Sequence, residues 1–206
     1  MASIVVRQAE YRDLPDIVSI HMSAFPEFFL TSLGGFFLKQ YYRLYIKFNH
    51  IALVCECEGT ICGFVVGTDD ASEFYKNLRS QWFYFLLPVV FNIFNLRLIK
   101  KIVTRATTVV FKRRINATDS RYDKFNELIS IGVCSAHQAK GIGGRLLAKY
   151  LSLCMNKDIE AVYLTTDATN NTKVIDFYKR SGFCLDKEFE QDRLRKMNVL
   201  VKYLDK

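Results

Sequence analysis

Hydrophobic and polar residues follow two periods along the chain, one typical of strands and one typical of helices. Short apolar runs between turn residues predict strands at residues 4–8, 51–57, 61–67, 127–133, 161–166, 183–189 and 197–204. The turn EGT, which contains Gly59, joins the second and third strands as a hairpin. The predicted fold class is therefore α/β (α+β), a mixed central sheet of about six to seven strands flanked by helices.

Apolar residues at helical spacing predict four helices between these strands. They begin after Asp13 and run through Ala24, extend from Phe37 to about Phe48, cover Leu146–Cys154, and run from Asn170 or Asn171 to Ser181-Gly182. The aromatic stripe of the second helix favours a place in the core over a ligand site. The last helix should be capped by one of its two asparagines and present Val174, Phe177 and Tyr178 inward.

A long insertion at about residues 69–126 separates the hairpin from the strand at 127–133. Its apolar stretch QWFYFLLPVVFNIFNLRLIKKI is interrupted by Pro88 and reaches Arg97 before the ~20 apolar residues of a membrane span. We favour a helical insertion that packs on the main domain or caps a site. A membrane span and an interfacial helix, whose basic residues would meet anionic lipid or nucleic acid, stay open. No linker or repeat divides the chain, so residues 1–206 are expected to form a single domain.

Composition and charge narrow the class of protein. Half of the 206 residues are hydrophobic, which excludes a disordered chain. Lys and Arg number 29 against 21 Asp and Glu, a net charge of +8 that attracts anions without choosing among nucleotides, nucleic acids and acidic lipids. The N-terminal residues lack the apolar run of a signal peptide, so we expect a cytoplasmic protein.

Cysteine and histidine patterns give no sign of a metal site. The six cysteines include no CxxC pair and mostly lie in apolar runs, at positions 55, 57, 62, 134, 154 and 184. We expect them to be reduced core residues, neither disulfide-bonded nor metal ligands. The three histidines, at 21, 50 and 137, do not cluster in the sequence, so no metal is expected.

Three glycines stand where the strand at 127–133 leads into the next helix, at positions 141, 143 and 144. Glycines let a backbone turn tightly and approach a ligand closely, and a helix N-terminus attracts phosphate. The loop is not a dinucleotide fingerprint, because Leu146 occupies the position of the third glycine, and it lacks the Gly-Lys-Ser/Thr of a P-loop. Taken alone, it could still be a tight turn with no ligand.

Two separated motifs resemble those of the GNAT superfamily of acyl-CoA-dependent N-acetyltransferases. QAKGIG matches the acyl-CoA loop Q/R-x-x-G-x-G/A, and NNTKVIDFYKRSGF matches an Asn followed by a helix that ends in F-Y-x-x-x-G-F. The resemblance is strong over residues 127–184 and elsewhere rests on the order of elements. The sequence departs from the family in lacking a proline after the strand and in its long insertion. The resemblance implies a GNAT fold, with acetyl-CoA as co-substrate and no metal.

The resemblance also assigns residues to the cofactor and to the chemistry. The cofactor-binding residues would be Ile131, Gly132, Val133, Gln138, Ala139, Lys140, Gly141, Ile142, Gly143, Gly144, Asn171 and Tyr178. The backbone N–H of Val133 would stabilise the oxyanion, and Tyr178 would protonate the departing thiolate. Glu127, eleven residues before Gln138, would be the general base, as its spacing is similar to that in the histone-acetylating branch. Lys140, Arg145 and Lys173 are candidate phosphate contacts.

The resemblance therefore implies transfer of an acetyl group to a primary amine, directly within a ternary complex. A small molecule or an amino sugar is the favoured acceptor. A non-catalytic acyl-CoA-binding module and a protein N-acetyltransferase are the alternatives, and a membrane- or nucleic-acid-binding protein acting through the basic insertion is a third reading. We expect no nucleic acid partner, while membrane contact through the insertion and a homodimer stay open.

Overall fold

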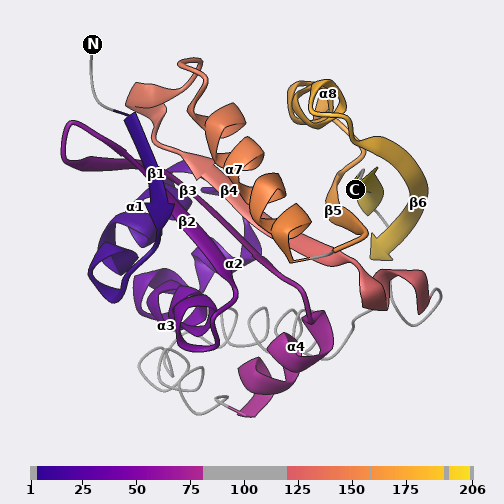
Figure 1. Cartoon of the computed structure of the whole chain (residues 1–206), viewed down its shortest axis with the longest axis horizontal. Helices are drawn as coiled ribbons and strands as arrows, with labels where there is room; N and C mark the ends of the chain where they lie inside the picture. Colours follow the sequence, from indigo (N-terminus) through magenta and orange to yellow (C-terminus); the bar gives the residue numbers. More distant parts are fainter. Residues whose placement is uncertain (1–3, 81–119, 158, 193–194, 205–206) are drawn as a thin grey trace.

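The computed structural model describes residues 4–80, 120–157, 159–192 and 195–204, and within them one mixed sheet has the strand order β1-β2-β3-β4-β5-β7-β6 (Figure 1). The strands are β1 (Ile4–Gln8), β2 (Ile51–Cys57), β3 (Thr60–Thr68), β4 (Asn126–Val133), β5 (Ala161–Asp167), β6 (Cys184–Asp192) and β7 (Arg195–Tyr203). The helices are α1 (Leu14–Ala24), α2 (Phe29–Ser32), α3 (Gly34–Lys47), α4 (Ala71–Ser80), α7 (Ile142–Asn156) and α8 (Thr172–Arg180). Short 3-10 turns lie at η1 (Tyr11–Asp13), η2 (Ser120–Lys124) and η3 (Ser135–His137). The predicted strands and helices are confirmed.

Helices cover both faces of the sheet. Successive residues of a strand point to opposite faces, so each strand contributes side chains to two buried clusters. Val54 and Phe64 pack with α1 and α3 in one buried cluster. Leu53 and Val65 face the other way and pack with α7 in a second cluster, which also contains Tyr178 of α8. In Figure 1, α1 and α3 accordingly lie on one side of the sheet, and α7 on the other. The two faces are referred to below as the α3 face and the α7 face.

The inward face of α8 differs from the prediction. Tyr178 is buried and Phe177 half-buried, but Val174 is 41% exposed and points to solvent. The helix is only nine residues long, so its contact with the sheet is narrower than the apolar pattern suggests. The prediction that Val174 faces inward is wrong.

The cap of α8 also differs from the prediction. Asn171 occupies the N-cap position, as expected, but its side chain makes no capping hydrogen bond. Its Nδ2 instead donates to Oγ1 of Thr166 at 2.6 Å and to the carbonyl oxygen of Asp167 at 3.2 Å. Asn171 therefore fastens the start of α8 to the end of β5.

The hairpin between β2 and β3 turns through two residues, where the sequence predicted the three of EGT. Glu58 and Gly59 have φ angles of 50° and 79°, the left-handed conformation that a tight type I′ turn requires at both positions. Thr60 already pairs with Cys57 and belongs to β3.

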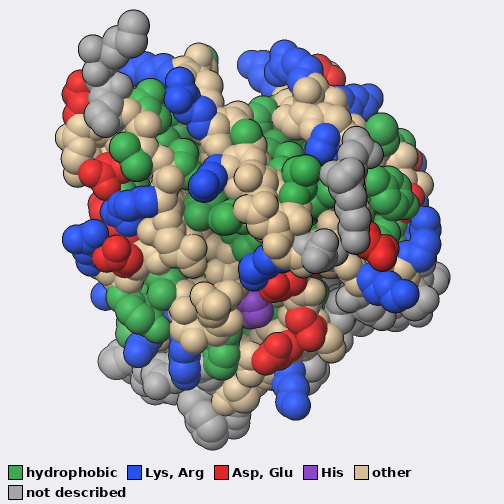
Figure 2. Space-filling view, viewed as in Figure 1, with side chains coloured by type: hydrophobic (Ala, Val, Ile, Leu, Met, Phe, Trp, Pro, Cys, Tyr) green, Lys and Arg blue, Asp and Glu red, His purple; other side chains and the backbone are tan. Residues whose placement is uncertain are grey.

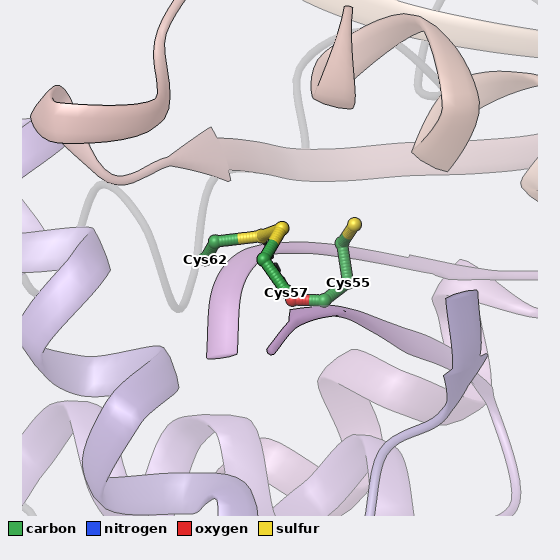
Figure 3. Close-up of side chains that lie close together, drawn as sticks. All are labelled: Cys55, Cys57 and Cys62. Atoms are coloured by element: carbon green, nitrogen blue, oxygen red, sulfur yellow. Dashed lines mark hydrogen bonds between the residues drawn. A yellow bond between two sulfur atoms is a disulfide. The ribbon is translucent and has the colours of Figure 1, made fainter. Parts of the chain in front are cut away.

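The hairpin joins Cys57 and Cys62 in a disulfide, with 6.2 Å between their Cα atoms (Figure 3). The expectation of reduced cysteines is therefore wrong for this pair. A register shift between Cys55 and Glu56 brings the two side chains together across the hairpin, which the spacing in the sequence does not reveal. Cys55 and Cys154 are buried and free, as expected.

Reduction of this disulfide should lower the free energy of unfolding by about 2 kcal/mol, the loss expected for a short closed loop. Urea denaturation of the wild type with and without a reductant measures the difference. A Cys57→Ala variant is the control, because its stability should not respond to the reductant. Equal stability of the oxidised and reduced wild type would contradict a stabilising disulfide.

The described ends of the insertion are helical and pack on the domain. Phe74 of α4 is fully buried, and its ring lies 4.5 Å from that of Tyr45 on α3, centroid to centroid. Residues 81–119 lie outside the described residues, and with them the whole of the predicted apolar stretch and its basic residues. No helix in the described part of the chain is long and apolar enough to cross a membrane.

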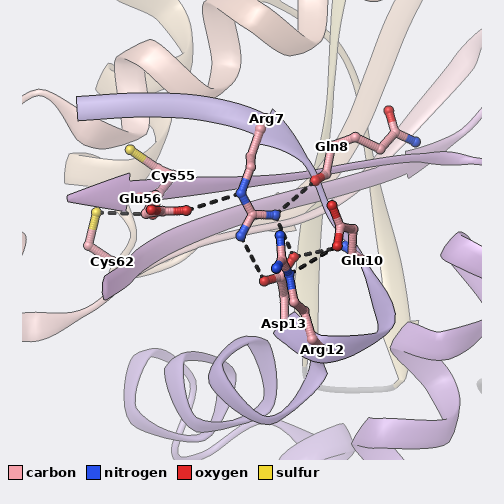
Figure 4. A network of polar contacts seen from close by, with 8 residues as sticks. All are labelled: Arg7, Gln8, Glu10, Arg12, Asp13, Cys55, Glu56 and Cys62. Carbon is pink, nitrogen blue, oxygen red and sulfur yellow. Dashed lines mark hydrogen bonds and ion pairs between the residues drawn. The ribbon is translucent and has the colours of Figure 1, made fainter. Parts of the chain in front are cut away.

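A network of charged groups ties the N-terminal strand to the start of α1 (Figure 4). The guanidinium of Arg7 on β1 donates to both carboxylate oxygens of Asp13, at 2.7 and 2.9 Å, and to Glu56 on β2 at 3.1 Å. Burial disfavours the charged carboxylate of Asp13, but the hydrogen bonds from Arg7 outweigh it and hold the pKa of Asp13 below its usual value. The network fixes the first helix against the sheet.

Candidate functional site

The sheet opens between its two parallel strands, β4 and β5. These strands pair only at Asn126 with Val162 and at Glu127 with Tyr163. β4 remains paired with β3 as far as Val133, and β5 with β7 as far as Asp167. Beyond their first residues, β4 and β5 therefore diverge, as the resemblance implied for the strand before the loop.

The opening leaves the innermost strand partly accessible. β4 lies at the centre of the sheet, yet only Asn126, Leu128 and Gly132 are fully buried. The other positions of the strand, including Ile131 and Val133, are half-buried. A central strand with a half-buried edge offers backbone groups to a ligand in place of a neighbouring strand.

The free edge of β4 carries the backbone groups of Val133. The N–H of Cys134 donates to the carbonyl oxygen of Cys62 on β3 at 2.9 Å. Because backbone groups alternate in direction along a strand, those of Val133 point the other way, toward β5. The Nε2 of Gln138 lies 3.5 Å from the carbonyl oxygen of Val133 on this side. Val133 thus presents an N–H to the opening, on the side where the resemblance would place the thioester carbonyl.

The glycine-rich loop ends at this opening and starts α7. Gly141 precedes the helix with a φ of 76°, a conformation that favours glycine, and Ala139 has a φ of 59°. The N–H of Arg145 makes a helical hydrogen bond to Gly141, so the N–H groups of the preceding first turn have no helical partner. These free N–H groups and the helix dipole would attract an anion to the end of the opening.

The residues of the glycine-rich loop differ in their burial. Ile142 is buried against the hairpin, whereas Gln138, Ala139, Lys140, Gly141 and Gly144 are exposed. A Cβ on Gly143 would lie 3.6 Å from the ring of Phe177 and 3.8 Å from Val133. Gly143 therefore lies between the end of β4 and α8, while Ile142 anchors the loop.

The surface is notched between the loop before α7 and helix α8, at the upper edge of Figure 2. Lys and Arg side chains border the notch on both sides. The predicted phosphate contacts, Lys140 of the loop, Arg145 of α7 and Lys173 of α8, are all exposed. A positive rim of this kind suits a phosphorylated ligand.

Tyr178 lies on the α7 face, in the same apolar cluster as Ile131, Val133 and Ile142. Its side chain is only 5% exposed, and burial raises the pKa of Tyr178 well above its ordinary value. The phenol therefore keeps its proton at neutral pH. It can act as a proton donor but not as a base.

Glu127 lies on the opposite side of the sheet from Tyr178. Its neighbours Asn126 and Leu128 face α7, since Asn126 accepts a hydrogen bond from Tyr150 and Leu128 packs in the α7-face cluster. The side chain of Glu127 therefore points to the α3 face. Burial, together with the nearby charge of Glu127, raises the pKa of Tyr41 on α3. The two predicted catalytic residues flank the opening from opposite faces.

The structure adds neighbours that the sequence did not point to. Arg195 at the start of β7 pairs with Asp167 at the end of β5, at 2.5 and 2.7 Å, and also lies over the ring of Phe28, 5.9 Å from its centroid. Phe28 belongs to the segment between α1 and α2. These residues border the opening on the α3 face, and only the folded chain brings the three together.

A mixed sheet that opens beside a glycine-rich turn into a helix is the arrangement of the GNAT acetyltransferase fold. A family model described as "Acetyltransferase (GNAT) family" matches residues 98–183 of the chain, about two fifths of its length. No curated protein matches the sequence.

Solved structures share this fold at low sequence identity. An N-acetyltransferase from Staphylococcus aureus Mu50 is 15% identical, with a TM-score of 0.64 and coverage of 98% of this chain and 99% of that one. YncA from Salmonella typhimurium, solved with its cofactor acetyl-CoA, is 16% identical, with a TM-score of 0.61 and coverage of 98% and 95%. PaiA N-acetyltransferase from Thermoplasma acidophilum, in complex with coenzyme A, is 12% identical, with a TM-score of 0.61 and coverage of 98% and 99%. The family match and the shared fold confirm the predicted resemblance to the GNAT superfamily.

Proposed function

We propose that this protein transfers the acetyl group of acetyl-CoA to a primary amine, directly within a ternary complex. The observation that carries the proposal is the divergence of β4 and β5 next to the free N–H groups that begin α7. The first feature accepts an extended arm with amide groups, and the second accepts a pyrophosphate. Acetyl-CoA has both parts, and two neighbours of the same fold were solved with acetyl-CoA or coenzyme A.

The cofactor would lie along the free edge of β4. The backbone groups of Ile131 and Val133 would pair with the pantetheine arm, which would run past Gly132, and residues 138–144 would surround the pyrophosphate. Asn171 would contact the arm from the other side, since its side chain already borders the end of β5. The bound acetyl-CoA supplies the thioester, and these residues of the chain orient it.

The chemistry needs a deprotonated amine, a polarised carbonyl and a proton for the thiolate. The N–H of Val133 would polarise the carbonyl. Tyr178, protonated because it is buried, would hydrogen-bond the departing sulfur and pass its proton to it as the C–S bond breaks, and the phenolate would then regain a proton from solvent. Glu127 would accept the proton of the amine from the α3 face, directly or through water. An acceptor that enters from that face would meet the thioester at the opening.

A small molecule or an amino sugar remains the favoured acceptor. A non-catalytic acyl-CoA-binding module is the second candidate, because the same opening and loop would bind the cofactor without turnover. Protein acceptors are a third class, which the long insertion could serve.

A Tyr178→Phe variant separates enzyme from binding module. Loss of the phenolic proton donor should lower kcat by about 100-fold, within the usual range for a general acid, and leave the acetyl-CoA Kd unchanged. Thiol release with a panel of amines measures turnover, and calorimetry measures binding. The substitution removes one oxygen and keeps the ring that packs on Phe183. Binding of acetyl-CoA by a wild type that turns over no amine would favour the binding module.

A further inference from the structure

The imidazole of His21 carries a buried nitrogen without a partner. His21 lies on α1 and is 2% exposed. Its Nδ1 lies 2.6 Å from the hydroxyl of Tyr42 on α3, while its Nε2 makes no hydrogen bond within the described chain. A buried polar atom left without a partner costs about 1–3 kcal/mol, so proteins rarely keep one without a reason.

The helix that carries His21, α1, packs against β4. Ser130 of β4, the residue that precedes the free edge at Ile131–Val133, lies close enough to the hydroxyl of Tyr42 to act on its pKa. Ile20, next to His21, would lie 3.5 Å from a Cβ on Gly132. His21 thus lies beside β4, on the α3 face, from which the acceptor of the proposed function would enter.

Two aromatic rings cover His21 from the solvent side. The ring of Phe25 lies 5.0 Å from the imidazole, and the ring of Phe28 lies 5.0 Å from that of Phe25. Phe28 is 46% exposed, and the guanidinium of Arg195 on β7 lies over its ring. Both rings belong to the segment between α1 and α3, whose only regular element is the four-residue helix α2. A change in the Phe25 side chain would uncover the imidazole, whose Nδ1 faces Tyr42 and whose Nε2 is left for a ligand.

We propose that Nε2 of His21 hydrogen-bonds a hydroxyl group of the acceptor, once Phe25 has moved aside. This inference rests on the proposed acetyl transfer and names its substrate class as a hydroxyl-bearing amine such as an amino sugar.

Two chemical arguments support a hydroxyl group. Nε2 donates when the Tyr42 hydroxyl donates to Nδ1, and accepts when Nδ1 donates to that hydroxyl, and a hydroxyl group can satisfy either tautomer. Burial also lowers the pKa of His21 to about 4, so the ring is neutral at pH 7 and does not repel the ammonium form of the acceptor. The side chains of Tyr42 and Ser130 beside it carry neutral hydroxyl groups, which suit a ligand that is itself rich in hydroxyl groups.

Two substitutions separate the nitrogens of the ring. His21→Asn keeps a polar group at the Nδ1 position, which faces Tyr42, and removes Nε2. His21→Gln keeps a polar group at the Nε2 position and removes Nδ1. The probes are glucosamine and cyclohexylamine, two six-membered ring amines that differ in their hydroxyl groups. KM and kcat for each amine and Kd for acetyl-CoA are measured for the wild type and both variants.

His21→Asn should raise KM for glucosamine about three- to tenfold, the worth of one hydrogen bond, and leave KM for cyclohexylamine and Kd for acetyl-CoA unchanged. His21→Gln, which keeps a polar group at the Nε2 position, should have a KM for glucosamine near that of the wild type. A purely structural role through Tyr42 predicts the reverse, with His21→Gln impaired for both amines and His21→Asn like the wild type. That outcome would overturn the proposal.

A measurement on the wild type keeps the proposal testable if a variant fails to fold. The ¹⁵N resonance of Nε2 in His21 should shift when glucosamine is added to the acetyl-CoA complex and should not shift with cyclohexylamine. Equal behaviour with both amines would sink the hydroxyl contact but leave the acetyltransferase function intact. Failure of the wild type to bind acetyl-CoA would overturn both.

Discussion

Replacement of Gly143 by leucine should weaken the binding of acetyl-CoA by at least about 100-fold, equivalent to about 2.7 kcal/mol. A Cβ at this position would point between Phe177 and Val133, at ordinary contact distances of 3.6 and 3.8 Å. A leucine side chain would extend from there into the space between β4 and α8. The protein would still fold, but the cofactor would lose its path along the free strand. Calorimetric titration of acetyl-CoA into the variant measures the loss.

Ala148→Leu is the matched control for this experiment. Ala148 lies about one turn further along α7, is exposed, and is not among the residues that would meet the cofactor. The same side chain should therefore leave the affinity near that of the wild type. Equal weakening in both variants would indicate a general disturbance of α7. Undiminished binding in Gly143→Leu would remove the cofactor from the opening.

Replacement of Gly67 by alanine should destabilise the fold by about 3 kcal/mol or more, because the added methyl group has no room. Its Cβ would overlap the hydroxyl of Tyr150 and lie 2.5 Å from the carbonyl oxygen of Glu127. Tyr150 is fully buried and donates to Asn126, so it cannot swing aside without breaking this bond. The damage falls where β4 and β5 make their only pairs. Urea denaturation measures the change in unfolding free energy.

The control for Gly67→Ala is Gly144→Ala, the same chemical change at a position where a Cβ would have no atom within 4 Å. Alanine has the higher helix propensity, so this variant should be as stable as the wild type or up to about 1 kcal/mol more stable. If Gly67→Ala were as stable as the wild type, Tyr150 would not be held in place as described.

The sequence predicted the elements because the chain's apolar periods match their faces. Leu146, Leu147 and Tyr150 recur as one helical face, and all three are buried on the sheet. The glycine-rich loop was also predictable, since Gly141 needs its left-handed φ and lies between a strand and a helix. Such signals depend on near neighbours in the chain.

The misses depend on contacts between distant residues. The alternation at 127–133 shows a central strand, but it contains nothing that says where pairing with β5 ends. The disulfide of Cys57 and Cys62 depends on the register of a hairpin, and the direction of Val174 on how little of α8 meets the sheet. His21 reads as one polar residue in an amphipathic helix, and only its contact with Tyr42 shows that one nitrogen is left unused.

Because β4 pairs with β5 over only two residue pairs, β4 has the properties of an edge strand although it lies in the middle of the sheet. The backbone ladder is continuous from β1 to β4 and again from β5 to β6, with two residue pairs as the seam. In the far half of β4, the amide hydrogens that point away from β3, such as that of Val133, are therefore shielded by side chains and helices and not by a neighbouring strand. We therefore expect the unpaired amide hydrogens of this central strand to exchange with water as readily as those of an edge strand. A ligand that paired with them would join the two halves of the sheet into a single cooperative unit.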